Sequence, residues 1–254
     1  MLKYFISLFI IILPLWAQAQ SEPIDLQAKD TVEYKDEYGL RVGADLSRLT
    51  FSFIDEDYTG LELVGDYRIT RKMYLAAEIG NEKKLQDEGL GNTLLYRYET
   101  SGSYVKAGVD INTYENWFGM NNAITIGGRY AFASFNQTLQ DYNIYESGHF
   151  FNPDLVPGAN PNVEYSGLSA SWLEFVMGVK AELFANIYIG MSARLGFLIT
   201  NKEDENFPNL WIPGFNKVTS GSNFGVGYNY TLTYFLPLYK KSKKKKETNT
   251  TEAQ

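Results

Sequence analysis

The sequence predicts an eight-stranded antiparallel up-and-down transmembrane β-barrel with short periplasmic turns and longer extracellular loops. Three observations lead to this fold class. A segment with the features of an export signal comes first, apolar and polar residues then alternate with period two over several segments, and aromatic residues make up 15% of the chain. After the signal no apolar run reaches the length of a membrane-spanning helix, so the prediction depends on strands.

Residues 1–19 have the pattern of a cleaved signal peptide. Lys3 supplies a positive charge, an apolar stretch runs from Tyr4 to Trp16, and Ala17-Gln18-Ala19 is an A-x-A cleavage site. An uncleaved membrane anchor is the alternative, but the apolar stretch is short for one. We therefore expect a secreted protein in which residues 20–37 form an acidic periplasmic linker.

Composition argues against several classes of function. The chain has no cysteine, so neither a disulfide framework nor a thiolate metal site is available. Its formal net charge of −7 argues against nucleic acid as a partner, because phosphate binding requires a basic surface. The acidic loop residues lack the spacing of a calcium-binding loop. We expect no metal site and no cofactor.

Alternating segments occupy residues 38–238, the predicted barrel. The last two are the clearest, because every second residue is apolar without a break. The segment around residue 105 has the weakest boundaries. The expected strands cover residues 38–46, 61–69, 72–79, 105–111, 124–132, 173–182, 187–199 and 224–236.

Short and long connections alternate along the predicted barrel. Thr70-Arg71 is a tight turn, whereas residues 81–92, 134–171 and 201–222 are expected to be long loops. Outer-membrane barrels show this alternation, with the short turns on the periplasmic side. An even number of strands then places both ends of the barrel domain in the periplasm.

The apolar face of the barrel is predicted to point outward, toward lipid. The interior of an eight-stranded barrel is only just wide enough for side chains, and ladders of Ile, Leu, Phe and Tyr are too bulky to be enclosed there. The polar face contains many glycines, which suit a narrow lumen. A soluble barrel with its apolar face inward is the alternative.

The polar face carries acidic and basic side chains in equal numbers, which predicts a salt-bridged plug rather than an ion pathway. A pathway normally shows one sign of charge at its constriction, so a narrow channel is the less favoured alternative. The predicted lumen ion-pair network is Arg41, Asp45, Glu62, Asp66, Arg68, Glu78, Lys106, Asp110, Arg129, Glu174, Lys180 and Arg194.

Catalysis by a small lipid-modifying barrel would need a nucleophilic serine with a histidine base. The single histidine, His149, and the nearby Ser147 lie in the longest predicted loop, where no strand holds them in place. We therefore expect no enzymatic activity and no catalytic residue. A lipid-modifying enzyme that uses Ser147 and His149 remains the alternative.

Two segments are candidate contact surfaces. The loop at residues 207–215 is unusually apolar, and such a patch is expected either to contact a partner or to fold over the barrel mouth as a lid. The Lys-rich tail, residues 239–254, is expected to contact anionic lipid, the acidic linker at residues 20–37 or a periplasmic partner, with a solvated tail as the alternative. The residues concerned are Trp211, Ile212, Pro213 and Phe215 in the loop, and Lys240, Lys241, Lys243, Lys244, Lys245 and Lys246 in the tail.

The segment Trp211-Ile212-Pro213-Gly214-Phe215, with residues 223–230 and 234–238 after it, resembles small outer-membrane β-barrels of unknown function from Gram-negative bacteria of the Bacteroidota type. The resemblance implies the cell outer membrane and no catalytic residues. It also implies an accessory role in an envelope complex, for example in barrel assembly or protein export, with outer-membrane lipid and other envelope proteins as partners. Asp30-Thr31-Val32 looks like the O-glycosylation sequon of such bacteria.

Overall fold

The computed structural model describes residues 35–90, 93–114, 122–145, 155–158, 162–184, 186–219 and 221–242. The chain divides into two compact units, and the described residues all belong to the second, Tyr34–Gln254. The predicted signal peptide, the possible sequon at Asp30, most of the predicted linker and most of the predicted tail lie outside the described residues.

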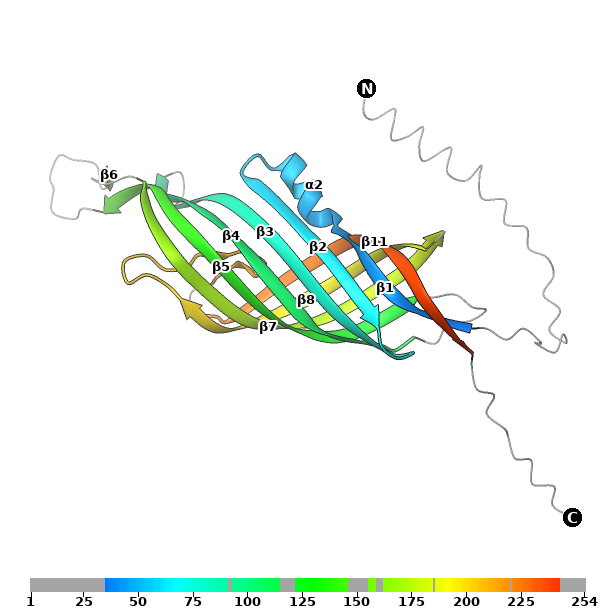
Figure 1. Ribbon diagram of the computed structural model, residues 1–254. Helices are drawn as coiled ribbons and strands as arrows, with labels where there is room; N and C mark the ends of the chain where they lie inside the picture. The colour runs from blue at the N-terminus through cyan, green and yellow to red at the C-terminus, as the bar shows by residue number, and fades with distance from the viewer. Residues whose placement is uncertain are drawn as a thin grey trace, which may run out of the picture. The chain divides into compact units, whose positions relative to one another are not determined.

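Among the described residues, eight long antiparallel strands form a sheet that closes on itself (Figure 1). Each pairs with the long strands before and after it in the chain, and the first pairs with the last. A sheet closed in this way has the geometry of an up-and-down barrel. The strands are β1 (Lys35–Asp45), β2 (Tyr58–Arg68), β3 (Met73–Leu90), β4 (Thr93–Asn112), β5 (Ala123–Tyr145), β7 (Val163–Phe184), β8 (Ile187–Lys202) and β11 (Phe224–Ser242).

Shorter elements lie in the connections at one end of the ring, which we call the mouth end. Helix α2 (Leu46–Ile54) joins β1 to β2, and β6 (Leu155–Pro157) pairs with the end of β5. Strands β9 (Trp211–Ile212) and β10 (Asn216–Lys217) pair with each other between β8 and β11, and we call residues 211–217 the mouth hairpin. Strand β3 also ends, and β4 begins, at the mouth end. The opposite end carries the remaining three connections, the start of β1 and the end of β11.

The all-β class and the antiparallel order agree with the sequence prediction, but two predicted loops are largely strand. Residues 81–90 were expected in a long loop; instead they extend β3, which stays paired with β4 as far as Leu90 and Thr93. Likewise, β5 continues to Tyr145 and β7 begins at Val163, inside the predicted loop 134–171. The extension of β3 is polar on both faces, so it lacks the alternation that identifies a strand with one apolar face. The extensions of β5 and β7 instead bury their apolar side chains inward, among them Phe135, Leu139 and Leu168, which reverses the pattern of the rest of the barrel.

Both ends of the barrel also extend beyond the predicted range. Strand β1 begins at Lys35, inside the predicted linker, and β11 continues to Ser242, inside the predicted tail; the two residues are paired. An ion pair of 2.6 Å between Glu37 and Lys240 joins these ends. Acidic and basic blocks that look like separate tails in the sequence therefore meet, in part, as neighbouring strands.

Helix α2 is not predicted by the alternation, which places Leu46 at the end of a strand. Asp45 ends β1 and caps the helix, because its Oδ1 accepts the Ser47 backbone N–H at 2.8 Å. The Ser52 hydroxyl oxygen accepts the Gly60 N–H at 2.8 Å, which attaches α2 to the edge of β2. No helix among the described residues is long and apolar enough to cross a membrane.

The two faces of the ring differ in polarity in the direction that the sequence predicts. Charged side chains on the inner face are buried, with Glu62 at 0% and Lys106 at 1% exposure, whereas Ile79 on the outer face is 60% exposed. This is the reverse of a soluble barrel. Exposed apolar side chains occur on all eight strands and include Val42, Leu63, Ile79, Val105, Phe132, Leu173, Ile189 and Leu236.

Candidate functional site

The middle of the interior is filled by six charged side chains, which we call the central network. Five strands contribute to it, from β3 to β8. Each side chain is at most 7% exposed, so the charges interact in a largely dehydrated space. The members are Glu78, Lys106, Asp110, Arg129, Glu174 and Arg194.

Arg194 on β8 connects opposite walls of the ring. Its Nη1 lies 2.6 Å from Glu78 Oε2 on β3 and 3.0 Å from Glu174 Oε2 on the neighbouring β7. Three strands separate β3 from β8 on one side of the closed sheet and three on the other. The Arg194–Glu78 pair therefore spans the interior and obstructs it.

The other two cations complete the central network. Lys106 Nζ lies 2.9 Å from Glu174 Oε1, and Arg129 Nη2 donates to Asp110 Oδ2 at 2.9 Å. The Trp172 indole N–H also donates to Glu174 Oε1, at 2.7 Å. Buried charges are tolerated when they are paired and hydrogen-bonded, and each member of the central network has at least one such partner.

A second ionic group lies toward the end opposite the mouth. Asp66 accepts from Arg41 at 2.7 Å and from Lys180 at 2.6 Å. The Arg41 guanidinium carbon lies 4.8 Å from the ring centroid of Tyr74 and 5.2 Å from that of Tyr188, which favours the cation further. A cavity of about 40 Å³ between this group and the central network has the volume of about one water molecule.

Asp45 and Glu62, predicted as members of the ion-pair network, form a hydrogen-bonded group nearer the mouth. The Tyr104 hydroxyl donates to Glu62 Oε2 at 2.5 Å. Asn229 Nδ2 donates to Glu62 Oε1 at 2.9 Å and also to Asp45. Most of the hydrogen bonds to these two carboxylates thus come from neutral donors rather than from cations.

Glu82 and Arg48 belong to the same group and are absent from the predicted network. Arg48 Nη1 lies 2.6 Å from Glu82 Oε1. Glu82 was missed because it was assigned to a loop, although it continues the two-residue period of Glu78 and Gly80. Asn229 likewise continues the period of Gly225 and Gly227. Arg48 carries no comparable signal, because it lies on the unpredicted helix.

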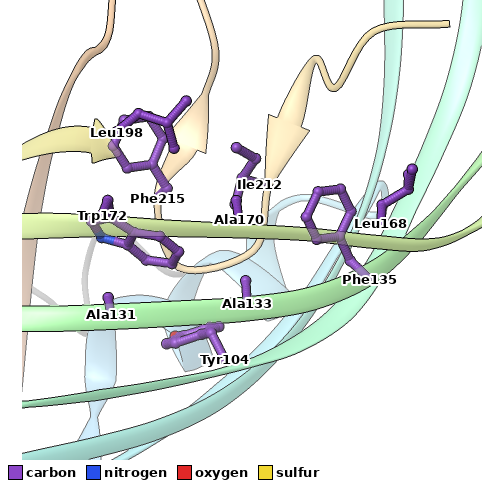
Figure 2. Packing of buried hydrophobic residues seen from close by; sticks show 10 residues of the cluster. All are labelled: Tyr104, Ala131, Ala133, Phe135, Leu168, Ala170, Trp172, Leu198, Ile212 and Phe215. Carbon is purple, nitrogen blue, oxygen red and sulfur yellow. The ribbon is translucent and has the colours of Figure 1, made fainter. Parts of the chain in front are cut away.

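The mouth hairpin folds into the ring and closes its interior with apolar side chains (Figure 2). Ile212 is fully buried, and Phe215 packs edge to face on Trp172 with ring centroids 5.5 Å apart. Gly214, at φ 79°, donates its N–H to Glu82 Oε2 at 3.1 Å, and its carbonyl accepts from Lys106 at 3.0 Å. A Cβ at this glycine would lie 2.6 Å from Tyr104 Cγ, so no larger residue fits.

Of the two predicted roles for this loop, its burial agrees with a lid over the mouth and not with an exposed apolar patch that contacts a partner. Ile212, Pro213 and Phe215 are buried, and Trp211 is only partly exposed, as a lid would be. The physical reason lies on β5 and β7, where small inward residues leave space under the mouth. They are Ala131, Ala133 and Ala170, and all belong to the same buried cluster as Ile212 and Phe215.

The remaining predicted residues lie at the far end or outside the described chain. Arg68 donates to the Glu37 carbonyl at 2.8 Å at the margin of the ring. Lys240 pairs with Glu37 on the neighbouring strand, and Lys241 lies on β11. The predicted tail residues Lys243, Lys244, Lys245 and Lys246 fall outside the described residues.

The residues of the enzymatic alternative, Ser147 and His149, also lie outside the described part of the chain. Within the described ranges, no group of three or more histidine, aspartate or glutamate side chains is arranged to hold a metal ion. The interior chemistry described is that of paired charges held by strands on all sides. It supports a rigid, filled interior.

A family model matches residues 1–241. The chain belongs to DUF6048, a domain of unknown function. No curated protein matches it. Among solved structures it is similar to the crystal structure of CarO2 from Acinetobacter baumannii, with 8% identity over 80% of this chain and 99% of that one, and a TM-score of 0.39. A likeness at this level carries no argument about function, and family membership supplies no activity.

Proposed function

We propose that the protein is an integral β-barrel of a bacterial outer membrane with a sealed interior, and that it serves as a non-enzymatic accessory subunit of an envelope complex. The observation that carries this proposal is the reversed polarity of the ring. Charged side chains are buried and paired in the middle of the interior, and large apolar side chains are exposed on the outer face of all eight strands.

The membrane assignment is supported by the free-energy cost of exposing so much apolar surface to water, which a soluble protein would have to bear. Soluble monomers rarely expose contiguous apolar patches larger than a few hundred Å². Met191, Val179 and Leu173 on neighbouring strands are each more than half exposed, and the apolar belt continues around the ring. Lipid removes this cost, and a closed sheet leaves no unpaired strand edge in the hydrocarbon.

The sealed interior is supported by two obstructions in series. The central network spans the ring at Arg194 and Glu78, and the mouth hairpin occupies the space nearer the mouth. A conducting lumen would require both to move. The proposed role therefore depends on outer surfaces and excludes transport through the barrel.

The accessory role requires an exposed surface outside the barrel interior that can contact another protein. With the mouth hairpin buried, α2 still displays two strongly exposed apolar side chains at the mouth end, Phe53 at 88% and Ile54 at 75%, on its last turn. Neither contributes to the interior network. We assign to this turn the contact with another envelope protein.

The test combines insertion, conductance and partner recovery. Refolded protein should show heat-modifiable mobility in gels, enter liposomes and give no steady conductance in planar bilayers. Mild-detergent purification from native membranes should recover one envelope protein in near-stoichiometric amount with the wild type and much less with Phe53→Ser/Ile54→Ser. Glu56→Ser, an exposed neighbour, is the matched control. Recovery of the wild-type chain alone would contradict the accessory role, and open conductance would contradict the seal.

A further inference from the structure

The wall of the ring is incomplete at the mouth end because β1 ends before the two strands that flank it do. The pairing of β1 stops at Asp45, opposite Thr231 of β11, and at Ala44, opposite Leu63 of β2. Strand β11 continues to Phe224 and β2 to Tyr58, but there they pair only with β8 and β3. A gap in the backbone hydrogen-bond ladder therefore separates residues 58–62 of β2 from residues 224–230 of β11.

Side chains, rather than a strand, bind the backbone along this gap. The Tyr230 N–H donates to Asp45 Oδ1 at 3.3 Å, and the Val226 carbonyl accepts from Asn216 Nδ2 at 3.1 Å. On the other edge, Ser52 of α2 exchanges hydrogen bonds with Gly60. The gap is therefore a feature stabilised by α2 and the mouth hairpin.

A pocket of about 330 Å³ lies in the gap. One part of its lining belongs to the outer face of the barrel, where Val226 is 75% and Tyr228 54% exposed, beside Phe51 of α2. Another part belongs to the mouth hairpin, which contributes Trp211 and Asn216. The pocket thus connects the outer surface with the interior filling.

Seven residues with polar groups also line the pocket: Ser47, Arg48, Asp55, Tyr58, Lys84, Trp211 and Asn216. Arg48 pairs with Glu82, and Lys84 lies 2.9 Å from Asp55. Two donors remain: Arg48 Nε and Trp211 Nε1 are buried and have no hydrogen-bond partner among the described residues. Arg48 Nε faces Asp45 Oδ2 only at 3.7 Å. A buried donor without a partner is energetically costly, so a ligand oxygen that accepts its hydrogen bond is favoured.

We propose that this pocket binds the anionic head group of a single-chain amphiphile that enters sideways from the membrane. The head-group oxygens accept from Arg48 Nε and Trp211 Nε1, with Lys84 as a nearby cation. The acyl chain leaves through the gap and lies along Val226 and Tyr228 on the outer face. A fatty-acid carboxylate and a lysophospholipid phosphate share this chemistry. The sideways route depends on the proposed membrane location; the head-group site does not.

The test is a titration of the full-length protein in detergent, read by native mass spectrometry, with palmitate in one arm and a lysophosphatidylethanolamine in the other. One saturable equivalent is expected in at least one arm, and the stronger arm identifies the head group. Trp211→Phe keeps the ring but removes the donor, and we expect binding about tenfold weaker. Val226→Trp narrows the gap from the outer face and should weaken binding at least as much.

Leu195→Trp is the matched control, because Leu195 pairs with Val226 on the outer face of the neighbouring strand and does not line the pocket. Equal binding by Leu195→Trp and the wild type supports the site. Equal weakening by Leu195→Trp and Val226→Trp, or no saturable binding in either arm by protein that shows heat-modifiable mobility, overturns it. Failure to enter liposomes would instead contradict the proposed function. Binding in detergent then still decides whether the head-group site exists.

Discussion

The interior of the ring is filled in two different ways along its length. In the central network, strands supply the filling themselves, through charged side chains that point inward and meet across the ring. At the mouth, the inward residues of β5 and β7 are small, and a hairpin from a distant part of the chain supplies the filling. The contrast shows that a wall residue can either fill the lumen or leave space for a segment that does so. Four substitutions probe the contrast, and their expected effects decrease in size from the first to the last.

The largest effect is expected from Arg194→Ala in the central network. The substitution leaves Glu78 and Glu174 without their shared cation, and removing one partner of a buried ion pair costs about 3–5 kcal/mol. Urea unfolding in detergent, followed by loss of heat-modifiable mobility, should show a global loss of this size. Glu99→Gln, which breaks the more exposed Lys83–Glu99 pair, is the control and should cost below about 1 kcal/mol.

Phe215→Ala should have a smaller effect of a different kind. The substitution leaves a cavity under the mouth hairpin and weakens its docking by about 3 kcal/mol. We expect faster amide exchange in residues 211–217 while the urea midpoint of the barrel changes little. Phe224→Ala, an outward-facing residue of the same type, should leave that exchange unchanged. Global unfolding at lower urea would mean that the hairpin and the wall form one cooperative unit.

Glu82→Gln acts where the two kinds of filling meet. Glu82 accepts from Arg48 and from the Gly214 N–H, so the neutral amide loses a charge-assisted bond on each side. We expect a loss of about 2 kcal/mol, measured by urea unfolding. Amide exchange in the mouth hairpin should rise as well. An increase in exchange without any global destabilisation would show that Glu82 serves the hairpin alone.

Asp55→Asn should have the smallest effect. The Lys84 ammonium donates a hydrogen bond to Asp55 and lowers the pKa of this carboxyl, which lies in the connection between α2 and β2. Because the pKa is lower in the folded state, the contribution of Asp55 is present above its unfolded pKa and disappears as the pH falls through the folded value. The pair is partly exposed, so the loss at neutral pH should be below about 1 kcal/mol. A difference between variant and wild type that persists at pH 2 would contradict this assignment.

Much of the barrel and of its central network is predictable from the chain. Each of the six members of the central network occupies an inward position of an alternating segment, so its direction follows from the two-residue period of a strand. Glu82 escapes prediction because the alternation fades where both faces are polar. Helix α2 is not predicted because it has only nine residues and begins directly after the alternating pattern of β1, with no separate signal for its start.

The strand class, the outward direction of the apolar face and the charged character of the lumen follow from the order of residues along the chain, because they depend on residues two apart in the same strand. Three other features become visible only in the folded ring: which charges pair, that the apolar loop around Trp211 folds inward, and that β1 ends before its neighbours do. Those features depend on the ring register, which brings Arg194 opposite Glu78 and Phe215 onto Trp172. The spacing of such residues along the chain carries no signal of their contact, because it is the closure of the ring that places them together.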